Sequence, residues 1–324
     1  MLSRRSVLAF APAILTGIAF PRPAGAQAAP NLRMVVPYAA GGPTDIQARL
    51  LGEHLGRSLN QSVVVENRTG AGVVVGTDAV AKAAPDGRTI LLTTVAHAVN
   101  PSLFPSLPFN TERDFAPVAL VAKVPLVVLV RNDLPARNIP ELIAWIRERG
   151  GQASYGSAGI GSAPHLGTAL FLMMAGTEAL HVPYRGSGPA LTDLAAGRLD
   201  FYIDAAASGL AQARGGTVRA IGWSMLRRSS IVPDLPTLDE QGVRGYEAYT
   251  WSALFVPAAT PKDIVLRLNG AVHEALTVPA LRMRFAEIGA ELVEPAPPEA
   301  LGAFVKDEIA KWREVVKKTG MSVQ

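Results

Sequence analysis

Short runs of apolar residues, many of them β-branched, alternate with amphipathic stretches along the chain from residue 32 onward. Such runs predict buried strands, whereas apolar residues that recur every three or four positions predict helices. Apolar strands separated by helices are typical of a mostly parallel sheet covered on both faces, so the pattern predicts an α/β fold. The predicted strands are 32–36, 63–65, 89–95, 118–121, 126–130, 153–156, 180–182, 200–203, 218–223 and 253–256.

The predicted helices lie between these strands and at the end of the chain. Asn138 and Pro140 mark the start of one of them, because Asn is a favoured N-cap and Pro is tolerated in the first helical turn. Three further helices, each opened by a proline, close the chain. The helices are predicted over 43–59, an alanine-rich segment ending at 84, 139–148, 261–276, 279–288 and 298–318.

The chain of 324 residues is long enough for about two domains of ~150 residues each. Because no single stretch has the composition of a linker, we expect one domain to be inserted into the other. The first lobe would comprise 27–125 and 252–324, and the second lobe 126–251. The chain would cross between the lobes twice, as two strands, and such a hinge suits closure of a cleft around a small ligand.

The first 26 residues have the features of a secretory signal peptide. Arg4 and Arg5 precede the apolar run 7–20, and the small residues 24–26 provide a cleavage site. The apolar run is shorter than a membrane span requires. We therefore predict export to the periplasm and a mature chain that begins near Gln27. The general and the twin-arginine export routes both remain open.

The charge distribution argues against a nucleic-acid partner. The formal charge is +4, but three of the 31 basic residues lie in the first 26 residues, so the remainder nearly balances the 27 acidic residues. Binding to phosphates needs a concentrated basic face, which predicts no nucleic-acid partner here. The chain has no cysteine, and its histidines at 54, 97, 165, 181 and 273 lack the spacing of a zinc site, so we predict no metal site.

A glycine-rich loop at 37–45 joins a predicted strand to a predicted helix. Its Gly41-Gly42 pair allows close backbone approach, and Thr44 places a hydroxyl beside the free amides of the first helical turn. A helix N-terminus of this kind can bind an anion. The alternative is an ordinary helix start in which Asp45 is a first-turn acid. The residues alone leave both interpretations open.

A second glycine-rich loop, at 67–76, approaches the spacing of a dinucleotide-binding fingerprint. That fingerprint also needs an acid after the following strand to hold the ribose. The strand 89–95 continues into Ala96 and His97 instead, and no glycine run precedes Lys-Ser or Lys-Thr as a P-loop requires. We therefore predict no cofactor.

A third loop, at 154–165, offers several amides and the hydroxyls of Ser157 and Ser162 to one carboxylate. Ser157 and His165 also raise the possibility of a hydrolase. The nucleophile elbow needs a glycine two residues before the serine, but Tyr155 and Ile160 stand there. We predict no catalytic residue, and a capping or packing role is the alternative for His165.

A fourth loop, at 182–190, contains Arg185, which could pair with an anion, although a surface arginine is the commoner outcome. The predicted strand that follows the next helix ends at Asp204. This carboxylate could accept a hydrogen bond from a ligand, or it could cap the next helix. Both roles remain open.

In their order along the chain, these blocks resemble the periplasmic substrate-binding proteins of tripartite tricarboxylate transporters, the TctC or Bug family. The resemblance covers essentially the whole mature chain. It departs from the family at Val73, where a third glycine is common, and at Ala259, where a glycine often precedes Thr-Pro. It is carried by Val36-Pro37-Tyr38 with Gly41-Gly42-Pro43-Thr44-Asp45, Glu66-Asn67-Arg68 with Gly70-Ala71-Gly72 and Gly76, Pro85-Asp86-Gly87 with Thr89, the third loop, and Pro183-Tyr184 with Pro189–Leu194.

The resemblance implies a type II periplasmic-binding fold with two lobes, each a mostly parallel sheet covered by helices, that close on a small carboxylate. Loops 38–45 and 157–165 would clasp the carboxylate from opposite lobes, and the far wall of the cleft would set specificity. The candidate ligand-binding residues are Tyr38, Gly42, Thr44, Asp45, Thr94, His97, Ser157, Gly159, Gly161, Ser162, His165, Tyr184 and Asp204, with Asn100 and Trp251 as further candidates for the wall.

The resemblance also implies a function without catalysis. The chain would act as a monomer that captures a small organic anion and delivers it to the membrane subunits of a tripartite transporter. An extracytoplasmic sensor that docks on a receptor or kinase is the alternative, and an enzyme is a third, weaker one. The sequence identifies neither the carboxylate nor the choice between transport and sensing.

Overall fold

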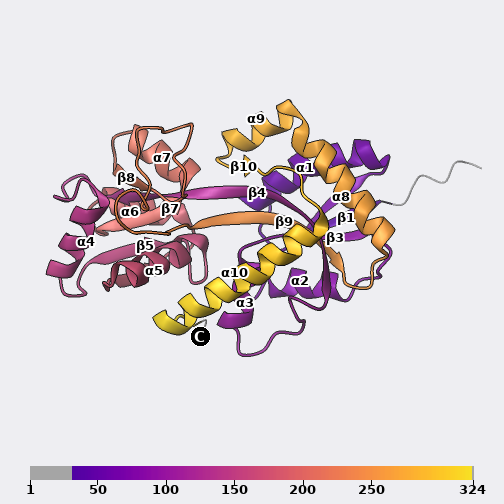
Figure 1. The fold of residues 1–324 in the computed structure, drawn as a ribbon, viewed down its shortest axis with the longest axis horizontal. Coiled ribbons are helices and arrows are strands. Elements are labelled where there is room, and N and C mark those ends of the chain that lie inside the picture. Colours follow the sequence, from indigo (N-terminus) through magenta and orange to yellow (C-terminus); the bar gives the residue numbers. More distant parts are fainter. Residues whose placement is uncertain (1–30, 323–324) are drawn as a thin grey trace, which may run out of the picture.

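One long strand, β4 (Phe115–Val130), runs from the first lobe of the molecule into the second (Figure 1). The computed structural model describes residues 31–322. The first part of β4 pairs antiparallel with β9 (Tyr249–Pro257), and its last five residues pair antiparallel with β7 (Phe201–Ala205) and β8 (Arg219–Trp223). Thus β4 and β9 are the two strands through which the chain crosses between the lobes.

Each lobe contains three parallel strands beside these crossing strands. In the first lobe β1 (Leu32–Val36) lies between β2 (Val63–Asn67) and β3 (Thr89–Thr94). In the second lobe β5 (Ser154–Ser157) lies between β6 (Leu180–Pro183) and β7. The order along the curled sheet is β2-β1-β3-β9-β4-β7-β5-β6, and the short strand β10 (Glu291–Leu292) pairs with β4. The parallel strands predicted from the apolar runs are therefore present, but the strands next to the crossing are antiparallel.

Helices cover both faces of the sheet (Figure 1). In α4, Asn138 accepts a hydrogen bond from the amide of Glu141, Pro140 lies in the first turn, and an apolar face is buried against the second lobe. The helices are α1 (Pro43–Leu59), α2 (Val74–Ala81), α3 (Ala96–Leu103), α4 (Ile139–Glu148), α5 (Ala163–Ala175), α6 (Ser187–Ala195), α7 (Ala206–Arg214), α8 (Lys262–Thr277), α9 (Pro279–Glu287) and α10 (Pro298–Thr319).

The last helix, α10, contacts elements of both lobes. It packs on α3, α8 and β4, and its C-terminal part reaches α5 of the second lobe (Figure 1). Its buried face includes Val305, Ile309, Trp312 and Val316, spaced three or four residues apart as helix periodicity requires. The helix therefore ties the second lobe to the first in addition to β4 and β9.

Two features of the fold differ from the sequence-based prediction. The strands predicted at 118–121 and 126–130 are one continuous strand, and its register shifts beside Pro117. Pro125 separates the two predicted runs, but it pairs with Tyr249 at the end of the contact between β4 and β9 without a register shift, and the strand continues from there into its pairing with β7. The segment after β3 forms the helix α3, which was not predicted. It has no N-cap side chain that would indicate its start, and it contains Pro101.

No helix within residues 31–322 is both long and apolar enough to cross a membrane. The signal peptide predicted at 1–26 lies outside the described residues.

Candidate ligand-binding site

A cleft of about 480 Å³ lies between the two lobes, and both lobes contribute to its walls. The first lobe supplies residues from the loop after β1, from α1, from the end of β3 and from α3. The second lobe supplies the segment 160–164 and the start of α7. The crossing strand β9 adds residues 250–252. Polar residues lining the cleft are Tyr38, Thr44, Gln47, Thr94, Asn100, Ser162, Ser208, Thr250 and Ser252.

The N-terminal turns of five helices reach this cleft, because each follows the carboxyl end of a strand. Two of them line the cleft from opposite lobes, α1 through Thr44 and α5 through Ser162 and Ala163. The first intrahelical hydrogen bond of α1 runs from the amide of Ile46 to Gly42, so the amides at positions 44 and 45 precede it. Free amides and the positive ends of helix dipoles favour an anion at this place.

Side-chain cations contribute nothing to the walls of the cleft. Among its lining residues, all within the described part of the chain, Tyr38 is the only one with an ionisable side chain. Tyr38 Oη lies 2.6 Å from the hydroxyl of Thr94, and burial raises the pKa of Tyr38 although this hydrogen bond opposes the shift. An anion in the cleft would therefore be held by amides, hydroxyls and helix dipoles.

Asp45 has a structural role in the loop after β1. Its carboxylate accepts hydrogen bonds from the amide of Gly41 (2.8 Å), Arg49 Nε (2.9 Å) and Asn67 Nδ2 (3.0 Å). The Arg49 side chain holds the pKa of Asp45 below its usual value. The neighbouring Gly42 is the N-cap of α1 and does not line the cleft itself. These contacts support the alternative considered for Asp45, in which it is an acid of the first helical turn that stabilises the helix start.

The carboxylate of Asp204 likewise receives its hydrogen bonds from residues of its own lobe. This fully buried carboxylate accepts hydrogen bonds from the hydroxyls of Ser187 and Ser208, each at 2.6 Å. Burial raises the pKa of Asp204, and the two hydroxyls partly offset that shift. Because Ser208 lies in the first turn of α7, Asp204 stabilises the start of this helix beside the cleft.

The amides of two glycines in the third loop, at 154–165, donate hydrogen bonds to side chains of the same loop. The amide of Gly159 donates to Ser157 Oγ (3.1 Å), and the amide of Gly161 donates to His165 Nδ1 (3.2 Å). Ser157 Oγ also lies 2.7 Å from His181 Nε2, and the imidazole rings of His165 and His181 stack with centroids 3.9 Å apart. Ser157 is fully buried, so this serine–histidine pair is not placed to act as a nucleophile.

These histidines support the loop from the side opposite the cleft. Burial, assisted by the neighbouring His181, lowers the pKa of His165 to about 3, and burial also lowers the pKa of His181. A neutral His165 can accept the hydrogen bond from Gly161, which would be lost if Nδ1 bound a proton. Gly161 and Ser162 line the cleft, whereas Ser157, Gly159 and His165 lie behind its wall.

Two other predicted residues lie away from the cleft. The hydroxyl of Tyr184 donates to the carboxylate of Asp193 at 2.7 Å. His97 is buried in the first lobe, where its ring centroid lies 5.0 Å from that of Phe115 and 4.6 Å from that of Phe255. Neither ring nitrogen of His97 has a hydrogen-bond partner among the described residues, and burial lowers its pKa to about 3.

The depressed pKa of His97 predicts a specific dependence of stability on pH. The unfolded chain binds a proton at this position below pH ~6.5, whereas the folded chain does not until the pH approaches 3. Stability from this residue is therefore complete above pH ~6.5 and falls by up to about 1.4 kcal/mol per pH unit as the pH drops toward 3. His97→Phe should flatten the profile of unfolding free energy measured in urea between pH 7.5 and 4.5.

The control is Phe109→Leu, a change in the same aromatic cluster that removes no titratable group. It should lower stability by a similar amount at every pH. Parallel pH profiles for the wild type and His97→Phe would contradict the assignment of a buried, neutral His97.

Two buried polar residues of the cleft were missed by the sequence analysis. Gln47 is 4% exposed and Ser252 is 2% exposed. Gln47 follows Thr44 by three residues, so helical periodicity alone places both on one face of α1. Ser252 lies directly opposite Thr94 in the pairing of β3 with β9, which only the long-range register of the sheet reveals.

Trp251 lines the cleft as predicted among the wall candidates, but its indole N–H is occupied. It donates to Glu308 Oε2 of α10 at 2.8 Å, and Trp312 donates to the same oxygen at 2.9 Å. Asn100 also lines the cleft, and its amide nitrogen donates to the carbonyl of Gly72 at 2.7 Å. The indole N–H of Trp251 is therefore not free to bind a ligand.

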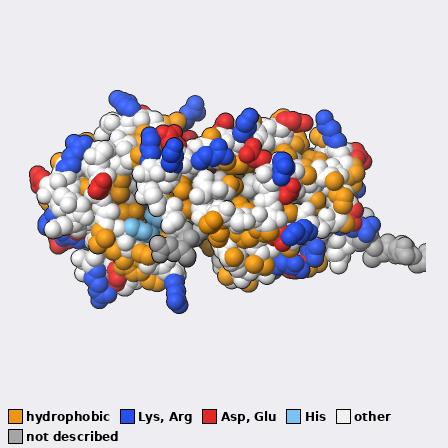
Figure 2. All heavy atoms as spheres, turned by 90° about the horizontal axis from the view of Figure 1, so that it is seen from below, with side chains coloured by type: hydrophobic (Ala, Val, Ile, Leu, Met, Phe, Trp, Pro, Cys, Tyr) orange, Lys and Arg blue, Asp and Glu red, His pale blue; other side chains and the backbone are white. Residues whose placement is uncertain are grey.

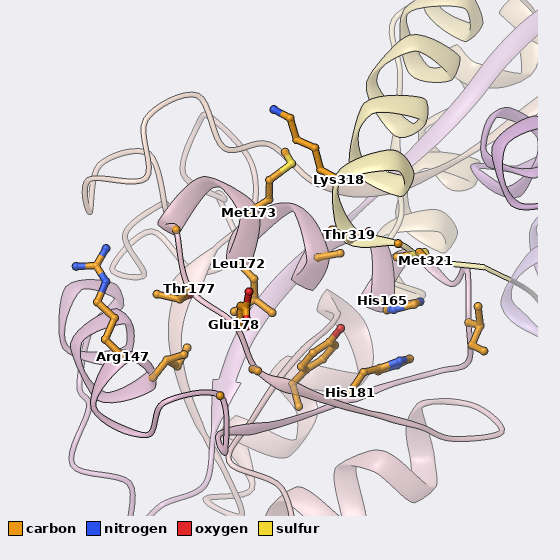
Figure 3. Close-up of a pocket in the computed structure, with 18 of the residues that line it drawn as sticks. Arg147, His165, Leu172, Met173, Thr177, Glu178, His181, Lys318, Thr319 and Met321 are labelled. Carbon is orange, nitrogen blue, oxygen red and sulfur yellow. The ribbon is translucent and has the colours of Figure 1, made fainter.

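A larger cavity of about 1060 Å³ lies on the second lobe beneath the end of α10 (Figure 3). His165 and His181 lie on one side of it, and histidine side chains reach the surface on this face of the second lobe in Figure 2. The C-terminal ends of three helices line it, through Gly150 after α4, Gly176 after α5 and Thr319 of α10. Helix C-termini carry negative partial charge, whereas the side chains of Arg147 and Lys318 add positive charge to the lining and Glu178 adds negative charge (Figure 3).

The fold and the cleft are those of a periplasmic binding protein. The solved structure of the periplasmic binding protein BugD is 38% identical to this chain, with a TM-score of 0.76 that covers 91% of this chain and 99% of BugD. The R. palustris protein Rpa4515, solved with adipate, is 35% identical, with a TM-score of 0.79 and coverage of 91% and 99%.

The sequence comparisons give the family. The model of the tripartite tricarboxylate transporter family receptor, TctC, matches residues 47–321. The protein BugT of Bordetella pertussis strain Tohama I is 39% identical over 310 residues, which is 95% of each chain. The chain belongs to the TctC family, which confirms the predicted resemblance. The family consists of receptors rather than enzymes, and the sensor alternative gains no support from these comparisons.

Proposed function

We propose that this protein captures a small organic carboxylate in the cleft between its lobes and delivers it to the membrane subunits of a tripartite transporter. Membership of the receptor family and the adipate in the related structure support this proposal. Within it, the chain acts in the periplasm as a monomer after removal of a signal peptide at 1–26.

The observation that carries the proposal is the pair of helix N-termini that line the cleft from opposite lobes, with Thr44 on α1 and Ser162 on α5. A charge-assisted hydrogen bond contributes ~1.5–3 kcal/mol, so four of them give roughly 6–12 kcal/mol. Association itself costs on the order of 4–15 kcal/mol. Useful affinity therefore also needs burial of the apolar part of the ligand, which closure of the lobes would supply.

Closure requires a hinge, and the crossing strands supply it. We place the lobe boundaries near 126 and 251, where β4 and β9 pass between the lobes. The loops of opposite lobes are already in contact across the cleft. Gly161 lies so near α3 that a Cβ atom on it would come within 2.7 Å of Leu103 Cδ1. Separation of the lobes would therefore widen the access of a ligand to the cleft.

A screen of organic acids tests the proposal. At 100 times its dissociation constant, a ligand that binds only the folded state stabilises it by about 2.7 kcal/mol. At least one small carboxylate should therefore raise the melting temperature, and native mass spectrometry of the freshly purified protein should show a small acid bound. The methyl ester of the same acid is the control and should bind far more weakly. A broad library without any stabilising carboxylate, and purified protein without a bound acid, would contradict the proposed function.

A further inference from the structure

The larger cavity, which lies on the second lobe beneath the end of α10, has room for a small molecule (Figure 3). Its volume is about 1060 Å³, and its lining combines apolar side chains with a few polar groups, as in ligand-binding pockets. It is separate from the cleft between the lobes, although Ile160 of the third loop lines both. The polar groups of this cavity therefore indicate what kind of molecule it can take.

The hydrogen bonds of the two stacked histidines determine which ring nitrogens carry protons. His165 Nδ1 accepts from the amide of Gly161, so the proton of this neutral ring is on Nε2. Ser157 Oγ already accepts from the amide of Gly159. The hydroxyl proton of this fully buried serine needs an acceptor, and His181 Nε2, 2.7 Å away, is the one that the described residues offer. His181 therefore carries its own proton on Nδ1.

Both histidines thus present an N–H group to the cavity. His165 Nε2 and His181 Nδ1 have no acceptor among the described residues, and the stacked rings place the two donors at one end of the cavity (Figure 3). Donors in a largely buried site are nearly always paired, so these two indicate an acceptor that enters the cavity. A metal ion would need a further ligand, and no third metal-ligating side chain accompanies them within residues 31–322.

The charged residues of the lining favour an uncharged ligand. Arg147 already donates to the carbonyl of Ala175 at 2.8 Å, and Lys318 pairs with Glu314 at 2.7 Å. Glu178 and the three helix C-termini add negative charge, which disfavours an anion. Burial lowers the pKa of each histidine and keeps it neutral, so the free groups at this end are uncharged donors, which disfavour a cation.

The side chains around the two donors suit an aromatic body. Tyr155 stacks on His181 with ring centroids 4.9 Å apart, and Tyr155 lines the cavity together with Met173 and Met321. Aromatic rings pack well on one another, and methionine sulfur makes favourable contacts with ring edges. A flat ring with one acceptor therefore fits this lining.

We propose that the larger cavity is a second ligand-binding site, which takes an uncharged aromatic compound whose carbonyl oxygen accepts hydrogen bonds from His165 and His181. A carbonyl oxygen has two lone pairs, so it can accept from both donors. The aromatic ring lies against Tyr155 and the two methionines. This site and its ligand class are distinct from the carboxylate in the cleft, so the inference stands or falls independently of the proposed function.

Three probes of similar size test the inference: acetophenone, toluene and benzoate. NMR signals of the ¹⁵N-labelled histidine rings at pH 8 follow each titration and report which nitrogens carry protons. Acetophenone should shift the signals of His165 and His181. It should bind about 10-fold more tightly than toluene, which has no acceptor, and than benzoate, which is charged. Equal or weaker binding of acetophenone, or protons on the opposite ring nitrogens, would overturn the inference.

Variants then locate the bound probe. His165→Asn keeps an acceptor near the position of Nδ1 and removes the Nε2–H donor, so the preference for acetophenone over toluene should fall from about 10-fold toward 1. Thr177→Val is the control, because it removes an unpaired hydroxyl from another part of the same cavity and should leave that preference unchanged. A preference that depends on Thr177 and not on His165 would contradict the proposed contact.

A second pair of variants tests the cavity as a whole. Ala179→Trp fills the cavity and should abolish the binding of acetophenone, whereas Ala300→Trp adds the same side chain at an exposed position outside it and should leave binding unchanged. Melting temperatures show that both variants fold. Acetophenone that binds equally well to the wild type and to folded Ala179→Trp would place the probe elsewhere and refute the second site.

Discussion

Glu308→Ala is expected to lower the free energy of unfolding by about 2–6 kcal/mol, because it removes the acceptor of two buried indole N–H groups, each worth about 1–3 kcal/mol when left unpaired. Trp251 and Trp312 both donate to Glu308 Oε2, and both indole side chains are 1% exposed. Lys311 Nζ lies 4.0 Å from the same carboxylate and would lose this counter-charge. The loss should appear as a lower midpoint in urea-induced unfolding.

Two further variants on α10 make the test specific. Glu308→Gln keeps an acceptor oxygen, so its stability should lie between those of the wild type and Glu308→Ala. Asp307→Ala removes the adjacent exposed carboxylate and should change stability by less than about 0.5 kcal/mol. If Glu308→Ala unfolds at the same urea concentration as Asp307→Ala, the hydrogen bond from Trp251 of β9 to Glu308 of α10 does not stabilise the crossing strand as described.

Thr44→Asp is expected to weaken carboxylate binding by at least about 100-fold, or ~2.7 kcal/mol, because it places a negative charge where the ligand carboxylate would lie. Thr44 is buried and lines the cleft in the first turn of α1. An acid in the first turn of a helix is favourable by about 0.3–1 kcal/mol, so the fold itself should not be weakened by the helix dipole. Calorimetry with the best carboxylate of the screen measures the effect.

Two control variants distinguish the effect of charge at position 44 on binding from the effect of side-chain shape and from that of an acid added elsewhere. Thr44→Asn introduces an uncharged side chain of the same shape as Asp and should retain measurable binding. Ala280→Asp adds an acid to the first turn of α9 at an exposed position outside the cleft and should leave binding unchanged. Equal affinities for the wild type and Thr44→Asp would show that the ligand does not lie at the N-terminus of α1.

Local sequence patterns were sufficient to predict the alternation of strands and helices. Largely apolar runs form β1, β3 and β7 at nearly the predicted positions, because a strand that is buried on both faces has a nearly continuous apolar sequence. The same reasoning failed at β4, where Pro125 interrupts the pattern although the strand continues through it. Pairing with β9, far away in the sequence, decides that outcome, and no local pattern contains this information.

The lining of the candidate site was predictable where backbone geometry alone positions a group. Thr44 and Ser162 lie at helix starts that follow glycines, and both line the cleft. Residues whose surroundings come from distant segments were not predictable in the same way. His97 faces Phe115 and Phe255 in the core, whereas Gln47 and Ser252 reach the cleft only because α1 and β9 meet there. The roles of these three side chains depend on contacts between distant segments, which local sequence patterns do not predict.

The most direct test of this account is a crystal structure of the protein with a bromine-labelled carboxylate chosen from the screen, in which anomalous scattering locates the bromine. The account predicts an anomalous peak in the cleft beside Trp251, with the carboxylate within hydrogen-bond distance of Thr44 and of the start of α5. A peak in the larger cavity beside His165 and His181, with the cleft between the lobes empty, would contradict it.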